Sequence, residues 1–136
     1  MVIITIPGEM RGKGRPRFGT AGGQPRAFTD ARTRSAEAWV RARAADAWTG
    51  APLGGPVSLR MEIGVPVPAS WSKRRRADAL AGAIWPTGKP DLDNVLKLVG
   101  DALNGIVWQD DKQVVRAEVV RRYVLVPQTV LTVAEV

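Results

Sequence analysis

Apolar and polar residues alternate most regularly over residues 57–65, and this stretch predicts the clearest strand of the chain. Every second residue is apolar there, and the intervening positions hold Ser, Arg, Glu and Gly. A period of two places all the apolar side chains on one face of a strand. Runs rich in β-branched residues predict three more strands, at residues 2–6, 113–126 and 129–136. The last two are expected to form a hairpin that turns at residues 127–128.

Helical spacing predicts helices in the gaps between these strands. The segment 31–48 is rich in alanine and has apolar residues three or four positions apart, and Thr29 and Asp30 can cap its start. A short helix is expected over residues 71–83, with Ser70 as its cap.

The third predicted helix carries the strongest apolar stripe. Six apolar residues fall on one face at spacings of three and four, namely Leu92, Val95, Leu96, Val99, Ala102 and Leu103. Asn104 and Gly105 should end this helix, because glycine suits the left-handed position beyond a helix end. Residues 8–28 are rich in Gly, Pro and basic side chains and are predicted to be a loop. The order of elements predicts an α+β fold, with a mixed β-sheet packed by helices in one small domain over residues 1–136.

Charge and residue content restrict the chemistry. The 136 residues include 20 Lys and Arg against 13 Asp and Glu, which gives a net charge of +7, and there is no His and no Cys. This composition excludes disulfides, zinc sites built on Cys or His, thiol nucleophiles and Ser-His-Asp triads. Any metal must be held by oxygen ligands, which favours Mg²⁺ and allows Mn²⁺. No apolar run reaches the length of a membrane span and the N-terminus does not resemble an export signal, so we expect a cytoplasmic protein without membrane contact.

Five aspartates are concentrated in one short segment. Asp91, Asp93, Asp101, Asp110 and Asp111 supply five of the 13 acidic residues within 21 positions. The flanking segments are basic. Carboxylates inside a basic surround are typical of enzymes that hydrolyse a polyanion, because the carboxylates can hold a metal at the scissile bond while the basic surface attracts phosphates.

Asp91 and Asp93 allow two interpretations. In an extended chain, residues two apart point to the same side, so both carboxylates could bind one ion with Leu92 turned into the core. Alternatively, the segment is a turn and Asp93 is the N-cap of the following helix. The spacing alone favours the cap, and the two interpretations are compatible because a cap uses only one oxygen.

Lys97 lies one helical turn after Asp93 and one turn before Asp101, so the three should form a polar ridge opposite the apolar stripe. They either form solvated ion pairs, which the spacing alone favours, or place the Lys97 ammonium where it can neutralise charge in a transition state. Asp110 and Asp111 are expected in a turn that keeps both hydrated. One of them could complete a metal site across from the start of the helix.

Basic residues gather in two further places. The stretch 11–17 has Arg or Lys at every second position, with Gly residues that expose backbone N–H groups, so it can follow a phosphate backbone. Residues 73–76 read KRRR, which is also typical of a solvated helix face. Trp71, Trp85 and Trp108 could stack on bases, although each is more typical of a core or an interface. The candidate nucleic-acid contacts are Arg11, Lys13, Arg15, Arg17, Lys73, Arg74, Arg75, Arg76 and Lys89.

The segment 89–114, KPDLDNVLKLVGDALNGIVWQDDKQV, resembles the signature of the RusA family of Holliday junction resolvases. The shared features are a DxDN at a helix start, a Lys four residues after the second Asp, a DALNG-like helix end and a DD pair before a strand. GKGRPRF at 12–18 and SWSKRRR at 70–76 resemble further basic segments of the family. The family's basic residue before the first Asp is replaced here by Pro90, with Lys89 one position earlier.

The resemblance implies a RusA-like fold and a magnesium-dependent endodeoxyribonuclease of DNA recombination and repair, from a bacterium or a phage. It also implies a homodimer that binds four-way junction DNA and nicks two strands of like polarity. Asp91, Asp93 and Asp111 match the family's catalytic, metal-binding carboxylates, Lys97 matches its catalytic lysine, and Asp110 is a further candidate ligand. Two alternatives stay open: a non-catalytic, structure-specific DNA-binding module, and a metal-dependent nuclease that acts on flaps or single strands.

Overall fold

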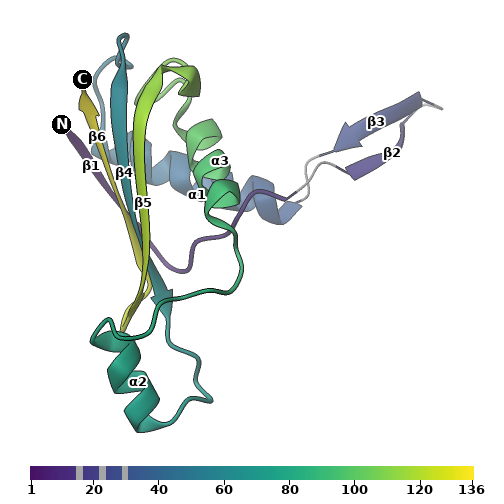
Figure 1. The fold of residues 1–136 in the computed structure, drawn as a ribbon. Coiled ribbons are helices and arrows are strands. Elements are labelled where there is room, and N and C mark those ends of the chain that lie inside the picture. Colours follow the sequence, from purple (N-terminus) through teal and green to yellow (C-terminus); the bar gives the residue numbers. More distant parts are fainter. Residues whose placement is uncertain (15–16, 22–23, 29–30) are drawn as a thin grey trace.

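A computed structural model describes residues 1–14, 17–21, 24–28 and 31–136, of which 17–21 and 24–28 are described by their backbone alone. It contains a mixed four-stranded sheet, a separate two-stranded sheet and three α-helices (Figure 1). This is the α+β architecture that the sequence predicts. In chain order the elements are β1 (Val2–Pro7), β2 (Arg17–Ala21), β3 (Gln24–Phe28), α1 (Ala31–Ala47), β4 (Val57–Pro66), α2 (Lys73–Leu80), α3 (Leu92–Leu103), the single 3₁₀ turn η1 (Asp111–Gln113), β5 (Val114–Val124) and β6 (Gln128–Glu135).

The main sheet has the strand order β1-β6-β4-β5, with β5 parallel to β4 and the other pairs antiparallel. The predicted hairpin between the last two strands is therefore wrong, because β4 lies between them. After β5 the chain crosses the end of β4 and returns along its other side. Gly64 makes this crossing possible, since a Cβ atom there would lie 2.6 Å from Val124 Cγ2 and 2.7 Å from the carbonyl oxygen of Gln128.

Helices α1 and α3 cover one face of the sheet, and the core lies between them and the strands (Figure 1). The predicted alternation in β4 is confirmed, because its four apolar residues from Val57 to Ile63 are buried. The stripe on α3 is confirmed in part. Leu92, the first helical residue, is 39% exposed, whereas Leu98 is fully buried although it lies outside the predicted six. Trp108 is also fully buried, so it belongs to the core and is not available for stacking on bases.

Residues 8–28 do not form one long loop, contrary to the prediction. They include β2 and β3, which pair antiparallel from Arg17 opposite Phe28 to Ala21 opposite Gln24, and Figure 1 shows this pair projecting from the body of the molecule. Main-chain hydrogen bonds can form such a pair without the apolar alternation that identifies a buried strand. The predicted helix cap at residues 29–30 lies outside the described residues.

Helix α2 projects at the end of the sheet where β4 finishes, well away from the β2–β3 pair (Figure 1). It begins at Lys73, and Ser72 is its cap, since the hydroxyl of Ser72 accepts a hydrogen bond of 3.2 Å from the backbone N–H of Arg75. The prediction of Ser70 as the cap is wrong by two residues. The shorter helix leaves Trp71 before the first turn, where its ring meets Tyr123 edge to face with the ring centroids 5.2 Å apart.

Candidate active site

Helix α3 begins one residue after Asp91, which differs from both interpretations of this segment. Asp91 is the N-cap residue, with an extended backbone, and its carboxylate makes no capping hydrogen bond. Asp93 is inside the first turn, and exposed Leu92 does not turn into the core. The helix therefore leaves the Asp91 carboxylate uncommitted, and two carboxylates lie near the positive end of the helix dipole.

A cavity of about 350 Å³ lies between α3 and the strands β4 and β5. Three charged side chains line it, those of Asp93, Lys97 and Asp111, and α3 supplies the first two one turn apart. Its apolar wall includes Leu59, Leu96, Trp108, Val114 and Ala117. An ion or a phosphate in this cavity would meet charged groups surrounded by largely apolar side chains. Electrostatic interactions are stronger there than in bulk water.

Gly100 brings Asp111 close to the helix. A Cβ atom at Gly100 would lie 3.3 Å from Asp111 Oδ2 and 3.5 Å from Asp111 Cβ, so any larger side chain would push the carboxylate outward. The sequence reasoning missed this residue. A glycine in a helix interior costs about 1 kcal/mol of helix stability relative to alanine. Its presence inside this predicted helix was therefore a signal that a neighbouring group packs closely there.

Lys97 and Asp101 connect the cavity to the N-terminal segment. The Nζ atom of Lys97 lies 3.4 Å from Asp101 Oδ1 and 3.8 Å from Asp111 Oδ2. On the other side of Asp101, the Lys13 ammonium donates a hydrogen bond to Oδ2 and lies 3.3 Å from Glu37. The ion-pair interpretation of the polar ridge is confirmed for Lys97 and Asp101. Lys97 also lines the cavity, and its action on a transition state stays a prediction.

Opposing effects set the pKa of Asp101. Partial burial raises this pKa, but the hydrogen bond from Lys13 and the charges of Lys13 and Lys97 outweigh burial and hold the pKa below its usual value. The pKa of Lys13 is raised in turn, mainly by its hydrogen bond to Asp101. At neutral pH Lys13 and Asp101 are therefore charged, and their ion pair ties the segment around Lys13 to α3.

Asp101→Asn should lower the free energy of unfolding by about 1–2 kcal/mol at pH 7, because it leaves Lys13 and Lys97 with weaker partners. The folded-state pKa of Asp101 is depressed, so its contribution is present above its unfolded pKa of about 3.9 and is lost as the pH falls through the folded pKa. Urea denaturation at pH 7 and at roughly pH 3 should show the difference from the wild-type protein shrinking with acid. Asp46→Asn, at an exposed position of α1, is the control. An equal difference at both pH values would contradict the ion-pair explanation.

Asp110 and Asp111 have different environments although they are adjacent. Asp110 is the N-cap of η1, where its carboxylate accepts the backbone N–H of Lys112 at 3.0 Å and Gln113 Oε1 accepts the N–H of Asp110 in return. The hydrogen bond from the Lys112 backbone is the main reason that the pKa of Asp110 lies below its usual value. Gln113 also donates to the carbonyl of Leu53 at 2.7 Å. The predicted turn is thus a capped 3₁₀ turn. The Asp110 carboxylate is used as its cap, and the Asp111 side chain lines the cavity.

The three predicted metal-binding carboxylates do not meet at one point. Among the described residues, no group of three or more Asp or Glu side chains is placed compactly enough to hold a metal ion. Asp93 and Asp111 share the cavity, whereas Asp91 does not line it. Two carboxylates nevertheless fit Mg²⁺, which proteins usually bind through one or two carboxylates together with water and substrate phosphates.

The predicted nucleic-acid contacts are spread over separate parts of the molecule. Arg11 and Lys89 line a second cavity beside the start of α3. Lys13 is paired with acids, as described above. Arg15 and the side chain of Arg17 lie outside the described residues. The basic run from Lys73 to Arg76 forms the first turn of α2, with the guanidinium of Arg75 3.8 Å from the centre of the Trp71 ring and Arg76 donating to the carbonyl of Pro68 at 3.2 Å.

Arg121 is a further residue that the sequence reasoning did not single out. Its guanidinium donates hydrogen bonds to the carbonyls of Gly88 at 2.7 Å and Pro90 at 2.9 Å, so β5 holds the loop that leads into Asp91. Its neighbour Arg122 instead stacks on Trp85, which is 53% exposed. Only the position of Arg121 in a basic strand, residues 116–122, was visible in the sequence.

Two comparisons with known proteins gave matches that cover most of the chain. The family model described as "Endodeoxyribonuclease RusA" matches residues 7–134. The chain is also 34% identical over 137 residues to "Uncharacterized protein YqaN" of Bacillus subtilis (strain 168), a match that covers 99% of this chain and 96% of the relative. Every residue that lines the cavity with Asp93, Lys97 and Asp111 falls within the range matched by the family.

Proposed function

Because the chain belongs to the RusA family of endodeoxyribonucleases, we propose that it resolves four-way DNA junctions by hydrolysing one phosphodiester in each of two strands of like polarity. The observation that supports this proposal most directly is the shared cavity of Asp93, Lys97 and Asp111. Two carboxylates and an ammonium around one opening are the groups that metal-assisted hydrolysis of a phosphodiester needs. A purely DNA-binding module would have no need of carboxylates in a surface that attracts phosphates.

Asp93 and Asp111 are the residues that would hold a Mg²⁺ ion, or Mn²⁺ in its place, with Asp91 as a further oxygen donor from the helix start. When bound, the ion would supply a water of lowered pKa and would screen the phosphate from the carboxylates. The protein's own contribution is to hold both carboxylates at the cavity from two separate elements. Asp93 does so from the first turn of α3, and Asp111 does so from η1 against Gly100.

Lys97 has the position to stabilise the charge that develops on the phosphate. Its ammonium lies at the cavity between Asp101 and Asp111, with 59% of the side chain exposed, so it can reach a phosphate oxygen without breaking a buried contact. The ion pair with Asp101 keeps the ammonium oriented. A donor placed in advance where negative charge develops is more effective than one that must reorganise during the reaction.

A homodimer would suit the substrate. A four-way junction is close to twofold symmetric, and a twofold dimer would present one cavity to each of two equivalent strands. The basic first turn of α2 and the second cavity beside α3 would then contact DNA at separate places.

No helix in the described part of the chain is long and apolar enough to cross a membrane.

The direct test is incubation of the purified protein with a fixed four-way junction that is labelled on each strand in turn, with and without Mg²⁺. We expect paired nicks in two opposite strands, only with the metal, and little cleavage of linear duplex. Tight junction binding without nicks would favour the non-catalytic module, and preferred cleavage of flaps or single strands would favour the other nuclease. Analytical ultracentrifugation of the same preparation would test the dimer.

A further inference from the structure

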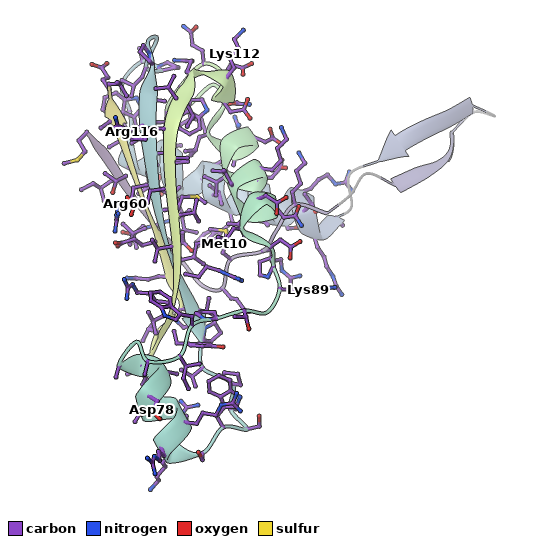
Figure 2. The ribbon with its side chains drawn as sticks, in the orientation of Figure 1. Met10, Arg60, Asp78, Lys89, Lys112 and Arg116 are labelled. Atoms are coloured by element: carbon purple, nitrogen blue, oxygen red, sulfur yellow. The ribbon has the colours of Figure 1, made fainter. Side chains whose placement is uncertain are left out.

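A second cavity, of about 450 Å³, lies beside the start of α3 and is separate from the one that holds Asp93 and Asp111. It is formed by the segment after β1, the first turn of α1 and the loop before Asp91. Figure 2 shows Lys89 of that loop close to the start of α3, on the side where the β2–β3 pair projects. Its size is in the range of small-molecule sites, which span roughly 300–1,000 Å³.

Backbone contacts fix the shape of this cavity. Gly12 packs so closely on the start of α3 that a Cβ atom would lie 2.9 Å from the Cβ atoms of both Asn94 and Pro90. The next residue, Lys13, donates its backbone N–H to the carbonyl of Asn94 at 3.0 Å, and the N–H of Gly14 donates to Thr33 Oγ1 at 2.9 Å. The segment 11–14 is therefore tied to both helices, and the cavity between them is preformed.

Three cations line the cavity, Arg11, Arg32 and Lys89, against one acid, Glu9. None of the three cations forms an ion pair within the described part of the chain, in contrast to nearby Lys13, which is paired with two carboxylates. Like charges that converge without a counter-ion raise the free energy of the protein alone and are relieved when an anion binds. Such a constellation favours a ligand with negative charge.

The position of the cavity indicates which anion. Lys89 is two residues before Asp91, and Arg121 holds the loop on both sides of Lys89 through the carbonyls of Gly88 and Pro90. A chain of phosphates that passes over the start of α3 would thus meet the three cations and then the carboxylates of α3. We propose that this cavity binds a backbone phosphate of the DNA strand that is cut, one or two nucleotides from the scissile phosphodiester. The inference rests on the proposed function, and it assigns a role in DNA binding to Arg32, which is not among the nucleic-acid contacts predicted from the sequence.

Arg32→Gln and Lys89→Gln test the proposal in binding measurements without divalent ion. Each should weaken junction binding by about threefold to tenfold and reduce the slope of log affinity against log salt by about 1, as expected for the loss of one phosphate contact. Arg34→Gln is the matched control, because it removes the same charge from the same turn of α1 at an exposed position that does not line the cavity. Thermal denaturation of each variant should match the wild-type protein.

Neutral methylphosphonate substitutions, placed singly along the cleaved strand, locate the contact. At one position next to the nick, the wild-type protein should lose affinity while Arg32→Gln loses nothing further. Equal affinity and salt slope in Arg32→Gln, Lys89→Gln and the control would overturn the proposal, as would a shared contact far from the nick. The affinity and salt-slope readouts need no catalysis, and only the position of the contact relative to the nick depends on it. A wild-type protein that binds junctions but never nicks them would therefore overturn the proposed function, while unchanged affinity in the variants would overturn this inference.

Discussion

Asp111→Asn should slow the nicking of a four-way junction by about a thousandfold under single-turnover conditions, because it removes one of the two carboxylates that face the cavity. An amide of nearly the same shape preserves packing against Gly100 but cannot contribute the negative charge that a divalent ion requires. Junction affinity measured without metal should stay the same or increase, since one repulsion with the phosphates is lost. Quenched-flow cleavage with protein in excess, together with an equilibrium binding assay, separates the two effects.

The adjacent Asp110 offers a sharp comparison. Asp110→Asn makes the same chemical change one residue away, but this carboxylate accepts the Lys112 N–H at the start of η1 and does not line the cavity. We expect a cost of less than tenfold in rate, through looser positioning of Asp111. Asp46→Asn, on the far end of α1, controls for net charge alone. A larger loss at Asp110 than at Asp111 would reverse the assignment of the two acids.

The strands and helices with a buried face were predictable because burial imposes a period on the sequence. In β4 the alternation from Val57 to Ile63 reports that one face meets the core, and in α3 the spacing from Val95 to Leu103 reports the same for a helix. Gly105 ends that stripe with a φ of +79°, as its position after the helix predicts. Such a period depends only on which face of an element is buried, so it can be recognised without knowing which elements pack against that face.

Strand order was not predictable in the same way. The sequences of β5 and β6 are compatible with a hairpin, since the connection between Val124 and Gln128 is short. In the structure β4 lies between them, and the chain crosses the end of β4 to reach β6. This crossing needs the space that Gly64 leaves by having no side chain. Nothing in an alternating pattern records which strand lies beside which. The pairing of β2 with β3 likewise leaves no sign in the hydrophobic pattern.

The candidate site divides along the same line. Asp93, Lys97 and Asp101 lie on one helix at intervals of four, so the sequence alone places them along one ridge. The approach of Asp111 to that ridge depends on the turn at Gly105 and on the missing side chain at Gly100. Whether a basic side chain is paired with an acid or is left facing a cavity also depends on the tertiary structure. Lys13 and Arg11 look equivalent in the sequence, yet Lys13 is engaged by Asp101 and Glu37 whereas Arg11 faces the second cavity.

Lys97→Ala should reduce the single-turnover rate of junction nicking by about a hundredfold, which is the usual cost of removing one donor aimed at developing charge. Junction affinity should fall by less than about threefold, because an exposed lysine contributes little to ground-state binding. Lys97→Arg, which keeps a positive charge at the position that pairs with Asp101, should recover part of the rate. Lys112→Ala removes a neighbouring exposed charge and should leave the rate nearly intact. The decisive comparison is between the rate at saturating protein and the dissociation constant. A variant whose rate recovers fully at saturation would make Lys97 a phosphate-positioning residue, and the cavity would then act through its two carboxylates alone.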